Sequence, residues 1–579
     1  MPGKTKAAKA RPTSSARGAA RKASAASSAC GAGRQSLRLR AVPEGKRCLQ
    51  RFVYKRPAAM AAAMPETRFG DAAKQKLAGH VRDGTVAYHV SVTAVKNLPK
   101  QIRDRLKSNL QAIDKVHVIS LMTGSGMDEP ACDAAERSWK DTGLLDERAG
   151  QKLFVPWVKC EKDQKKRDHL FRCFGTGCCM YDDVSSFASW SSATAKPKCC
   201  THGHIGLEHL LEDPEVKAVI VVSGFSCKDF SKLNNFAKQK GISLKDLLDK
   251  GSSSTTLAST LRIIDLFSDL VLFVILENVD NMDGGHDKKN SLSVVEHLAT
   301  YGVVAMRLLA NCSDYGLPQR RVRLYFAGYN QDHPMVSETT RDDFEETVVR
   351  VMETSMMSAP DLRECLLPPE DAFVKHCLGY LQHLDKTRTD EQKEQILWPG
   401  LHMEVVARSH LRWGGLKKHR STMTSKFYKC FPQRMKEVIN FAEENPDFPK
   451  KAELCCDPSQ NMHRFALGEM HNDESLITGT IIPNGWPWVG FANRCTSGGE
   501  QLAFQGFPIK QHQKALLVME EPEIRDLSGN AFPCTVVGSL INGMFAGVQL
   551  VPPEPHFLSG RSLFMQSLRA ASPGSSDDA

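Results

Sequence analysis

The fold of this chain is most constrained by two apolar, β-branched runs of strand length. Each run is followed directly by polar or reactive residues. Residues 218–222 read Ala-Val-Ile-Val-Val and lead into Ser-Gly-Phe-Ser-Cys at 223–227. Residues 270–276 read Leu-Val-Leu-Phe-Val-Ile-Leu and lead into Glu-Asn-Val at 277–279. Continuous apolar runs of this length are typical of parallel strands buried on both faces. They predict an α/β fold with a doubly wound, Rossmann-like sheet.

The same pattern predicts one crevice in which three functional side chains meet. In a doubly wound sheet, ligands bind beyond the carboxyl ends of the strands, where the thiol of Cys227 and the carboxylate of Glu277 can converge. A third residue, Arg323, opens the apolar run Val-Arg-Leu-Tyr-Phe-Ala at 322–327. A thiol, an acid and an arginine around one crevice suit nucleophilic attack on an electron-poor ring, with the charge stabilised alongside.

A glycine turn indicates where a cofactor would approach the same sheet. Residues 116–122 read as the first strand, Thr-Gly-Ser-Gly at 123–126 as a turn, and 131–139 as the helix that follows. Glycine lets the backbone come close to a ligand where a side chain would collide. About one strand and one helix later, the strand-like run 154–160 ends at Glu161, whose carboxylate can accept hydrogen bonds from ribose hydroxyls.

These segments and three later motifs resemble those of the cytosine-5 DNA methyltransferases, in that family's order. The later motifs are Asp-Tyr-Gly-Leu-Pro-Gln-Arg-Arg-Val-Arg (314–323), Gln-Gly-Phe-Pro (505–508) preceded by Glu500, and Gly-Asn-Ala-Phe-Pro (529–533). Each short motif alone is weak, but their shared order over residues ~115 to ~550 makes coincidence improbable. The resemblance implies transfer of a methyl group from S-adenosylmethionine to carbon 5 of cytosine.

The resemblance also assigns roles to the residues of the crevice. Cys227 would add to carbon 6 of the cytosine, which makes carbon 5 reactive toward the methyl group, and elimination would then restore the thiol. Glu277 would hold nitrogen 3 of the ring, and Arg323, with Arg321 nearby, the ring carbonyl. A base inside a duplex is out of reach, so the cytosine must flip, and the loop 230–251 is expected to fill the space it leaves. The implied cofactor contacts are Gly124, Gly126, Glu161, Asp183 and Asn530.

The chain departs from the family's pattern at two places. Ser120 and Met122 stand where the family has Asp and Phe before the glycine turn. Ser226 and Lys228 flank Cys227 where the family has Pro and Gln. Serine leaves the loop freer than proline, and the charge of Lys228 can lower the pKa of the thiol. Two interpretations stay open: a relaxed but working site, or an adaptation to a particular substrate.

Charge is concentrated at the amino-terminal end. Residues 1–64 contain 15 Lys or Arg and one acid, whereas the rest, with 61 basic and 65 acidic residues, carries a net charge of −4. The Ala-, Ser-, Gly- and Arg-rich composition predicts a disordered basic tail. Such a tail attracts nucleic acid and suits a nuclear protein, with an organellar transit peptide as the alternative.

The motif order predicts a catalytic domain interrupted by a smaller target-recognition domain. The predicted parts are a disordered basic tail (1–64), a helical lead-in (65–114), the catalytic domain (115–330), the target-recognition region (331–490), the closing part of the catalytic domain (491–552) and a disordered tail (553–579). Within the recognition region, residues 408–436 contain nine Lys or Arg, no acid and four interleaved aromatics, which favours contact with nucleic acid. The predicted nucleic-acid contacts are Lys228, Ser231, Arg412, Lys417, Lys418 and Arg420.

The 18 cysteines are scattered, which fits a reducing compartment better than a disulfide framework. Seven zinc-compatible residues fall within 32 positions: Cys173, Cys178, Cys179, Cys199, Cys200, His202 and His204. Because the paired C-x-x-C spacing of a structural zinc site is absent, we expect ordinary reduced cysteines and no metal, with zinc as the alternative. No apolar run approaches the ~20 residues that span a bilayer, so we expect no membrane partner.

The sequence therefore predicts a DNA (cytosine-5-)-methyltransferase that uses S-adenosylmethionine and has DNA as its partner. It indicates no particular protein partner. Two alternatives stay open: methylation of tRNA or other RNA, and a non-catalytic nucleic-acid-binding protein that keeps the fold. The presence of Cys227, Glu277 and Arg323 argues against the second alternative.

Overall fold

The computed structural model describes residues 53–54, 71–122, 124–146, 151–188, 196–211, 213–227, 252–283, 290–394, 425–444, 449–451, 453–460, 469–470 and 475–553. All of them belong to one compact unit that starts at Phe52. The two predicted tails lie outside the described residues, apart from residues 53–54 and 553. Within the described part of the chain, no helix is long and apolar enough to cross a membrane.

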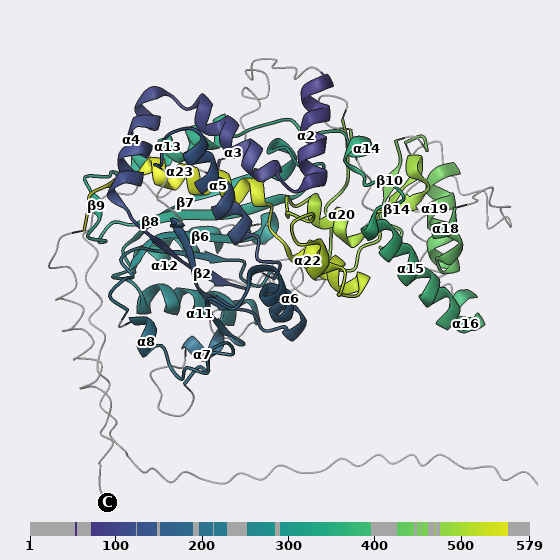
Figure 1. The fold of residues 1–579 in the computed structure, drawn as a ribbon, viewed down its shortest axis with the longest axis horizontal. Helices are drawn as coiled ribbons and strands as arrows, with labels where there is room; N and C mark the ends of the chain where they lie inside the picture. The colour runs from purple at the N-terminus through teal and green to yellow at the C-terminus, as the bar shows by residue number, and fades with distance from the viewer. Residues whose placement is uncertain are drawn as a thin grey trace, which may run out of the picture. The chain divides into compact units, whose positions relative to one another are not determined.

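An eight-stranded sheet lies at the centre of this unit (Figure 1). Its strands follow the order β1-β7-β8-β6-β5-β2-β3-β4, and β8 alone runs antiparallel to its neighbours. The strands are β1 (Val53–Tyr54), β2 (Val116–Leu121), β3 (Phe154–Cys160), β4 (Cys179–Tyr181), β5 (Val219–Ser223), β6 (Val271–Val279), β7 (Val303–Asn311) and β8 (Val322–Asn330). The predicted α/β fold with a mostly parallel central sheet is thus confirmed.

Helices cover both faces of the sheet, as the apolar runs require. The helices on the first face are α3 (Val86–Asn97), α4 (Lys100–Ala112), α5 (Asp128–Asp141), α13 (Arg341–Thr354) and α23 (Cys534–Gly547). Those on the second face include α8 (Glu208–Leu211), α11 (Ser252–Leu266) and α12 (Asn290–Ala299). Successive strand residues face opposite layers: Ile220 packs in the first core and Val221 in the second. All of β5 is therefore buried.

Shorter elements connect and flank these layers. They are α2 (Asp71–Asp83), α6 (Gln164–Phe174), α7 (Ser185–Ala188), α14 (Leu362–Cys365), α20 (Gly498–Ala503), α21 (Gln513–Leu516), α22 (Glu521–Asn530), β9 (Val336–Ser337) and β15 (Gln549–Leu550). Strand β9 pairs with β15, and α13 packs on α23, so residues 336–354 are joined to the helix layer of the central sheet.

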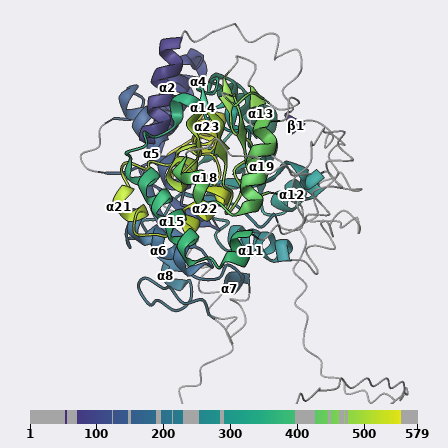
Figure 2. The ribbon, with the colours of Figure 1, turned by 90° about the vertical axis from the view of Figure 1, so that its right-hand side faces the viewer.

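The rest of the predicted recognition region forms helices and short strands, with β14 just beyond its predicted end, and this part of the chain faces the viewer in Figure 2. The helices are α15 (Ala372–Thr387), α16 (Asp390–Glu394), α18 (Lys426–Cys430) and α19 (Gln433–Glu444). The strands are β10 (Cys455–Cys456), β11 (Glu469–Met470), β12 (Leu476–Ile477), β13 (Trp488–Val489) and β14 (Arg494–Cys495). Helix α15 contacts α20 and α22, which link this group to the carboxyl-terminal motifs.

Asn109 of α4 holds the carboxyl end of α23 in place. Its buried amide nitrogen donates to the carbonyl oxygens of Phe545 and Val548, at 2.7 Å each. Its carbonyl oxygen accepts from the backbone N–H of Leu550 at 2.8 Å. One side chain thus satisfies two carbonyls at the end of α23 and one amide of β15.

Replacement of Asn109 by Ala should lower the free energy of unfolding by about 2–4 kcal/mol, because it leaves three buried backbone groups without their partner. Urea denaturation followed by circular dichroism measures this change. Gln111→Ala is the matched control, since Gln111 is exposed on the same helix. Equal stability of the two variants would contradict this role of Asn109.

Candidate active site

The strand order reverses between β2 and β5, and the two loops that leave these strands run side by side. From β2 the chain adds β3 and β4 on one side, and then returns to place β5 and β6 on the other. The N–H of Gly224, after β5, donates to the carbonyl of Leu121 at the end of β2, at 3.2 Å. A side-chain carbon on Gly224 would lie 3.5 Å from the carbonyl oxygen of Met122. This reversal is where open α/β sheets bind their ligands.

The loop after β2 has the backbone that the glycine turn predicted. Gly124 and Gly126 have φ values of +58° and +72°, which side chains other than glycine adopt at a cost. A Cβ on Gly126 would lie 2.6 Å from Phe174 and 2.7 Å from Leu170, so α6 packs directly on this turn. A Cβ on Gly124 would have Asn530 as its nearest neighbour, at 3.8 Å. The turn is thus tight toward α6 and more open beside Asn530.

The two predicted acids follow the next two strands at the same edge. Glu161 comes directly after β3, and its carboxylate accepts from the N–H of Asp163 at 3.0 Å. Asp183 follows β4 by two residues and accepts from the N–H of Ser185 at 2.9 Å. Burial alone would raise the pKa of Asp183, but the hydrogen bonds from Ser185 and the nearby Lys162 lower it overall. Asp183 is therefore a carboxylate at neutral pH.

Asn530 ends α22 beside the glycine turn. Its amide nitrogen donates to the backbone carbonyl of Asp526 at 2.8 Å and to the carboxylate of the same residue at 3.1 Å. The amide group is thus held within its own helix, next to Gly124.

Glu277 and Arg323 form an ion pair on the surface of the sheet. In the antiparallel pairing of β6 with β8, Glu277 lies opposite Tyr325 and Arg323 opposite Val279, so the two side chains are diagonal neighbours on one face. The Nε atom of Arg323 lies 3.0 Å from Oε1 of Glu277, and the two side chains are only 14% and 15% exposed. Oε1 of Glu277 is buried and, apart from this ion pair, has no hydrogen-bond partner among the described residues.

Cys227 lies close enough to this pair for both charges to affect its thiol. Burial, followed by the negative charge of Glu277, raises the pKa of Cys227, and the positive charges of Arg323 and Arg321 partly oppose this. The thiol is therefore mostly protonated at neutral pH before a substrate binds. The charges of Glu277 and Arg323 thus both act on the thiol of Cys227.

Arg321 has partners that the sequence did not predict. It is buried, and its two terminal nitrogens donate to the carbonyls of Ile481 at 3.0 Å and Gly529 at 3.2 Å. Burial, then repulsion from Arg323, lowers the pKa of Arg321 to about 10, so it stays positively charged. These bonds hold the backbone beside Asn530, so Arg321 positions this segment, and its contact with the ring carbonyl stays a prediction.

Buried glutamines join the late sequence motifs to one another. The amide of Gln319 donates to the carbonyl of Phe504 at 2.8 Å, and the amide of Gln505 donates to the carbonyl of Ser528 at 3.1 Å. Gln505 also donates to the side-chain oxygen of Gln319 at 3.4 Å. These hydrogen bonds join the segments around residues 319, 505 and 529 to one another.

Two residues that sequence reasoning missed fix the loop that carries Cys227. Asn278 donates from its amide to the carbonyl of Phe225 at 3.2 Å. The hydroxyl of Thr256, in α11, accepts from the N–H of Ser226 at 3.0 Å. Asn278 lies inside the Glu-Asn-Val segment and could have been found there, whereas Thr256 follows no recognisable motif.

The predicted nucleic-acid contacts fall outside the part of the chain that the structure describes. They are Lys228, Ser231, Arg412, Lys417, Lys418 and Arg420, and most of the loop 230–251 lies outside as well.

The sheet order, the glycine turn at the reversal and the reactive groups beside it define a Rossmann-like α/β protein of the methyltransferase class. The sequence pattern of the C-5 cytosine-specific DNA methylases matches residues 210–546. The chain therefore belongs to the C-5 cytosine-specific DNA methylase family.

Individual relatives are distant. The DNA (cytosine-5-)-methyltransferase DMT5 of Cryptococcus neoformans var. grubii is 24% identical over 353 residues, which cover 55% of this chain and 13% of that protein. Among solved structures, the S. pombe Dnmt2 methyltransferase is 13% identical and the match covers 74% of this chain and 98% of that one, with a TM-score of 0.34. The Entamoeba histolytica methyltransferase EhMeth is 12% identical, with 75% and 98% covered and a TM-score of 0.32.

Replacement of Glu277 by Gln should speed the alkylation of Cys227 by iodoacetamide several-fold at pH 7, because it removes a negative charge that raises the pKa of the thiol. Peptide mass spectrometry measures alkylation at Cys227 separately from the other cysteines. Glu296→Gln, an exposed position in α12, is the control and should leave the rate unchanged. A slower reaction in Glu277→Gln would contradict this electrostatic account.

Proposed function

We propose that this protein transfers a methyl group from S-adenosylmethionine to carbon 5 of cytosine in DNA, through a covalent adduct with Cys227. The observation that carries the proposal is the Glu277–Arg323 ion pair beside the Cys227 thiol, in a chain of the C-5 cytosine-specific DNA methylase family.

The residues near the glycine turn fit the proposed cofactor. S-adenosylmethionine supplies an electrophilic methyl group when bound. The open backbone at Gly124 leaves room for a ligand, and the carboxylates of Glu161 and Asp183 lie at the ends of adjacent strands, where ribose and adenine groups can be held. Asn530 borders the same space.

The three catalytic residues have complementary tasks in this proposal. The Cys227 sulfur loses its proton and forms a bond to carbon 6, which moves electron density to carbon 5. Glu277 holds nitrogen 3 through its carboxylate and stabilises the protonated form of the ring, while Arg323 pairs with the ring carbonyl. After methyl transfer, loss of the proton from carbon 5 breaks the sulfur–carbon bond and restores the thiolate.

The recognition of DNA is assigned to the region between the catalytic motifs. Residues 336–354 pack with the central sheet, so we place the start of the recognition region after Thr354 and its end near 490. Its basic and aromatic segment 408–436 is proposed to contact phosphates and bases. A DNA substrate and the basic tail 1–64 support a nuclear location.

A duplex that carries 5-fluorocytosine should trap Cys227, because fluorine replaces the proton that must leave before elimination. We expect a stable adduct in the presence of S-adenosylmethionine, located on Cys227 by mass spectrometry, and no adduct or methyl transfer in Cys227→Ala. Cys200→Ala, at an exposed cysteine, is the control and should react as the unaltered protein does. Trapping by tRNA alone would assign an RNA substrate. No product on duplex DNA, single strands or tRNA would instead indicate a non-catalytic binding protein.

Replacement of Ser226 by Pro should slow single-turnover methylation up to about tenfold, because proline has no N–H to donate to Thr256. In a Thr256→Val background the same replacement should cost much less, since the acceptor is already gone. This outcome would favour the interpretation that Ser226 is an adaptation of the catalytic loop. A faster reaction in Ser226→Pro would show instead that the serine only relaxes the site.

A further inference from the structure

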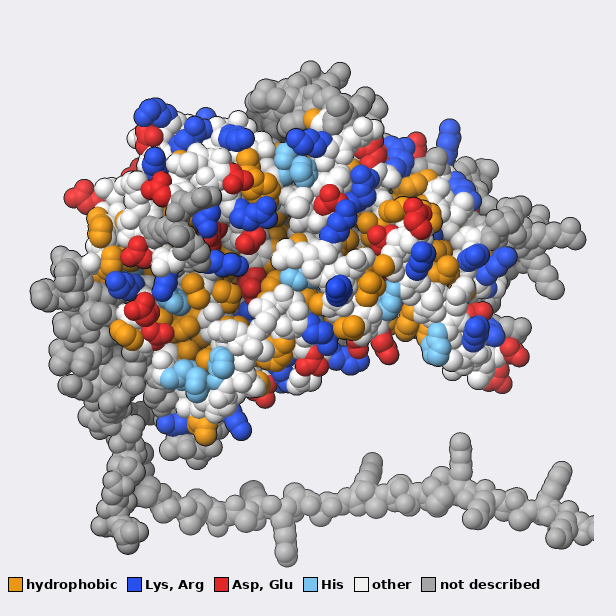
Figure 3. Space-filling model, in the orientation of Figure 1, with side chains coloured by type: hydrophobic (Ala, Val, Ile, Leu, Met, Phe, Trp, Pro, Cys, Tyr) orange, Lys and Arg blue, Asp and Glu red, His pale blue; other side chains and the backbone are white. Residues whose placement is uncertain are grey.

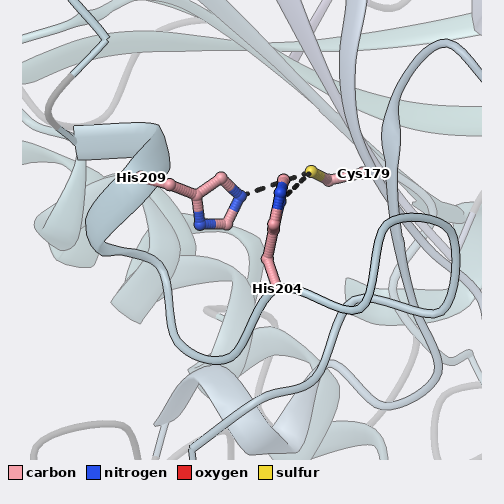
Figure 4. A group of neighbouring side chains, drawn as sticks. All are labelled: Cys179, His204 and His209. Carbon is pink, nitrogen blue, oxygen red and sulfur yellow. Dashed lines mark hydrogen bonds between the residues drawn. The ribbon is translucent and has the colours of Figure 1, made fainter.

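Five potential metal ligands form two overlapping sets between the edge strand β4 and helix α8. Cys179 begins β4, Cys199, His202 and His204 lie in the segment that follows it, and His209 lies in α8. The Sγ atom of Cys179 is 3.5 Å from Nδ1 of His202, 3.8 Å from Nδ1 of His204 and 3.4 Å from Nε2 of His209. Figure 4 shows the rings of His204 and His209 turned toward this sulfur.

Cys199 extends the group on the other side. Its Sγ atom lies 3.8 Å from Nδ1 of His202. Cys179, Cys199 and His202 form one set of mutually close ligand atoms, and Cys179, His204 and His209 form another, within 4.8 Å in each case. Cys179 is common to both sets.

Hydrogen bonding alone does not explain why three imidazole nitrogens lie around the sulfur of Cys179. A thiol has one proton and can donate it to one nitrogen only, and sulfur is a weak acceptor. A tetrahedral zinc ion with Zn–S bonds of about 2.3 Å and Zn–N bonds of about 2.0–2.1 Å separates its sulfur and nitrogen ligands by about 3.6 Å. The four measured sulfur–nitrogen distances lie between 3.4 and 3.8 Å.

We propose that this group is a structural zinc site, with Cys179, His204 and His209 as three ligands and the thiolate of Cys199 as the fourth, once a side-chain rotation brings the Cys199 sulfur from the neighbouring set to the ion. Thiolate and imidazole together select zinc over magnesium or calcium, which prefer oxygen. Two thiolates also neutralise the charge of the ion, which favours its binding beside the buried side chains of both cysteines.

The backbone around Cys199 is shaped for such a site. The N–H of His202 donates to the sulfur of Cys199 at 3.3 Å. A hydrogen bond of this kind stabilises a thiolate. Gly203 and Gly206 have φ values of +74° and +83°, which permit the tight turn between the ligands. The turn is open to the surface: Figure 3 shows histidine side chains gathered in the region of α7 and α8, where His202 and His204 are exposed.

Bound zinc would fix an edge of the central sheet. The N–H of Cys200 donates to the carbonyl of Met180 at 2.6 Å, so the turn already lies against β4. Asp183 follows the same strand by two residues. Strand β4 is an edge strand, with β3 as its only neighbour in the sheet among the described residues. The ion would therefore tie β4 to the segment that ends in α8 and steady the loop that carries Asp183.

This inference replaces the expectation of ordinary reduced cysteines. The sequence contains no C-x-x-C pair here, and His209 was not among the candidate ligands. Only the fold brings His209 to the sulfur of Cys179.

Zinc content of the full-length protein, measured by plasma mass spectrometry after dialysis against metal-free buffer, tests the site. We expect one zinc ion per chain, lost in Cys179→Ser and reduced at least severalfold in His209→Ala. Cys200→Ser is the matched control, since Cys200 is exposed, adjoins Cys199 and belongs to neither set of ligand atoms. It should retain the zinc. Protein that holds no zinc even after incubation with zinc chloride, or equal zinc in all variants, would overturn the proposal.

Cobalt substitution identifies the ligands without relying on the stability of one variant. Co²⁺ in this site should give the visible spectrum of a tetrahedral ion with thiolate charge-transfer bands, and His204→Ala or His209→Ala should change it while circular dichroism shows a folded chain. An octahedral spectrum without those bands would overturn the proposal. Metal content does not depend on methyl transfer, so this result and the test of the proposed function can fail independently.

Discussion

The reversal of strand order between β2 and β5 is the constraint on which the rest of the site depends. It sends the loops from two neighbouring strands toward opposite faces of the sheet, one with the glycine turn toward α5 and one with Cys227 toward α11, and the Gly224–Leu121 hydrogen bond joins the starts of the two loops. The cofactor and the nucleophile can therefore share one edge of the sheet. Helix α6 packs directly on Gly126, so a side chain at this position would collide with Phe174 and Leu170.

Buried polar side chains also join segments that are far apart in the chain. Arg321 binds carbonyls of Ile481 and Gly529, while Gln319 and Gln505 join two further segments. Leaving any of these groups unpaired inside the protein would cost about 1–3 kcal/mol each. Within the late motifs, Gln319, Arg321 and Gln505 thus hold together the segments that carry Arg323 and Asn530.

The electrostatics of the site favour a thiol that is inert until a substrate binds. Burial and Glu277 keep Cys227 protonated, and two arginines provide only part of the compensation. In the proposed mechanism, a base that binds the carboxylate of Glu277 would weaken the effect of that negative charge on the thiol, so binding would favour the thiolate. The proposed zinc site lies at β4, at the edge of the sheet next to the proposed cofactor residues. Its role would be to stabilise the fold, and it would take no part in methyl transfer.

The sequence by itself determined the central strands and the edge at which the functional residues lie. Unbroken apolar, β-branched runs such as 218–222 have few stable places outside a doubly covered sheet, and the residues that follow them must then lie at its carboxyl edge. The sequence did not identify β7, because Ala, Met, Leu and Arg307 within it suit a helix equally well, and its pairing with β8 decides the matter. Tertiary structure alone decided the partners of Arg321, the contact of Thr256 with the Cys227 loop and the approach of His209 to Cys179. Each of these contacts joins segments that are far apart in the chain, and such contacts cannot be predicted from local composition.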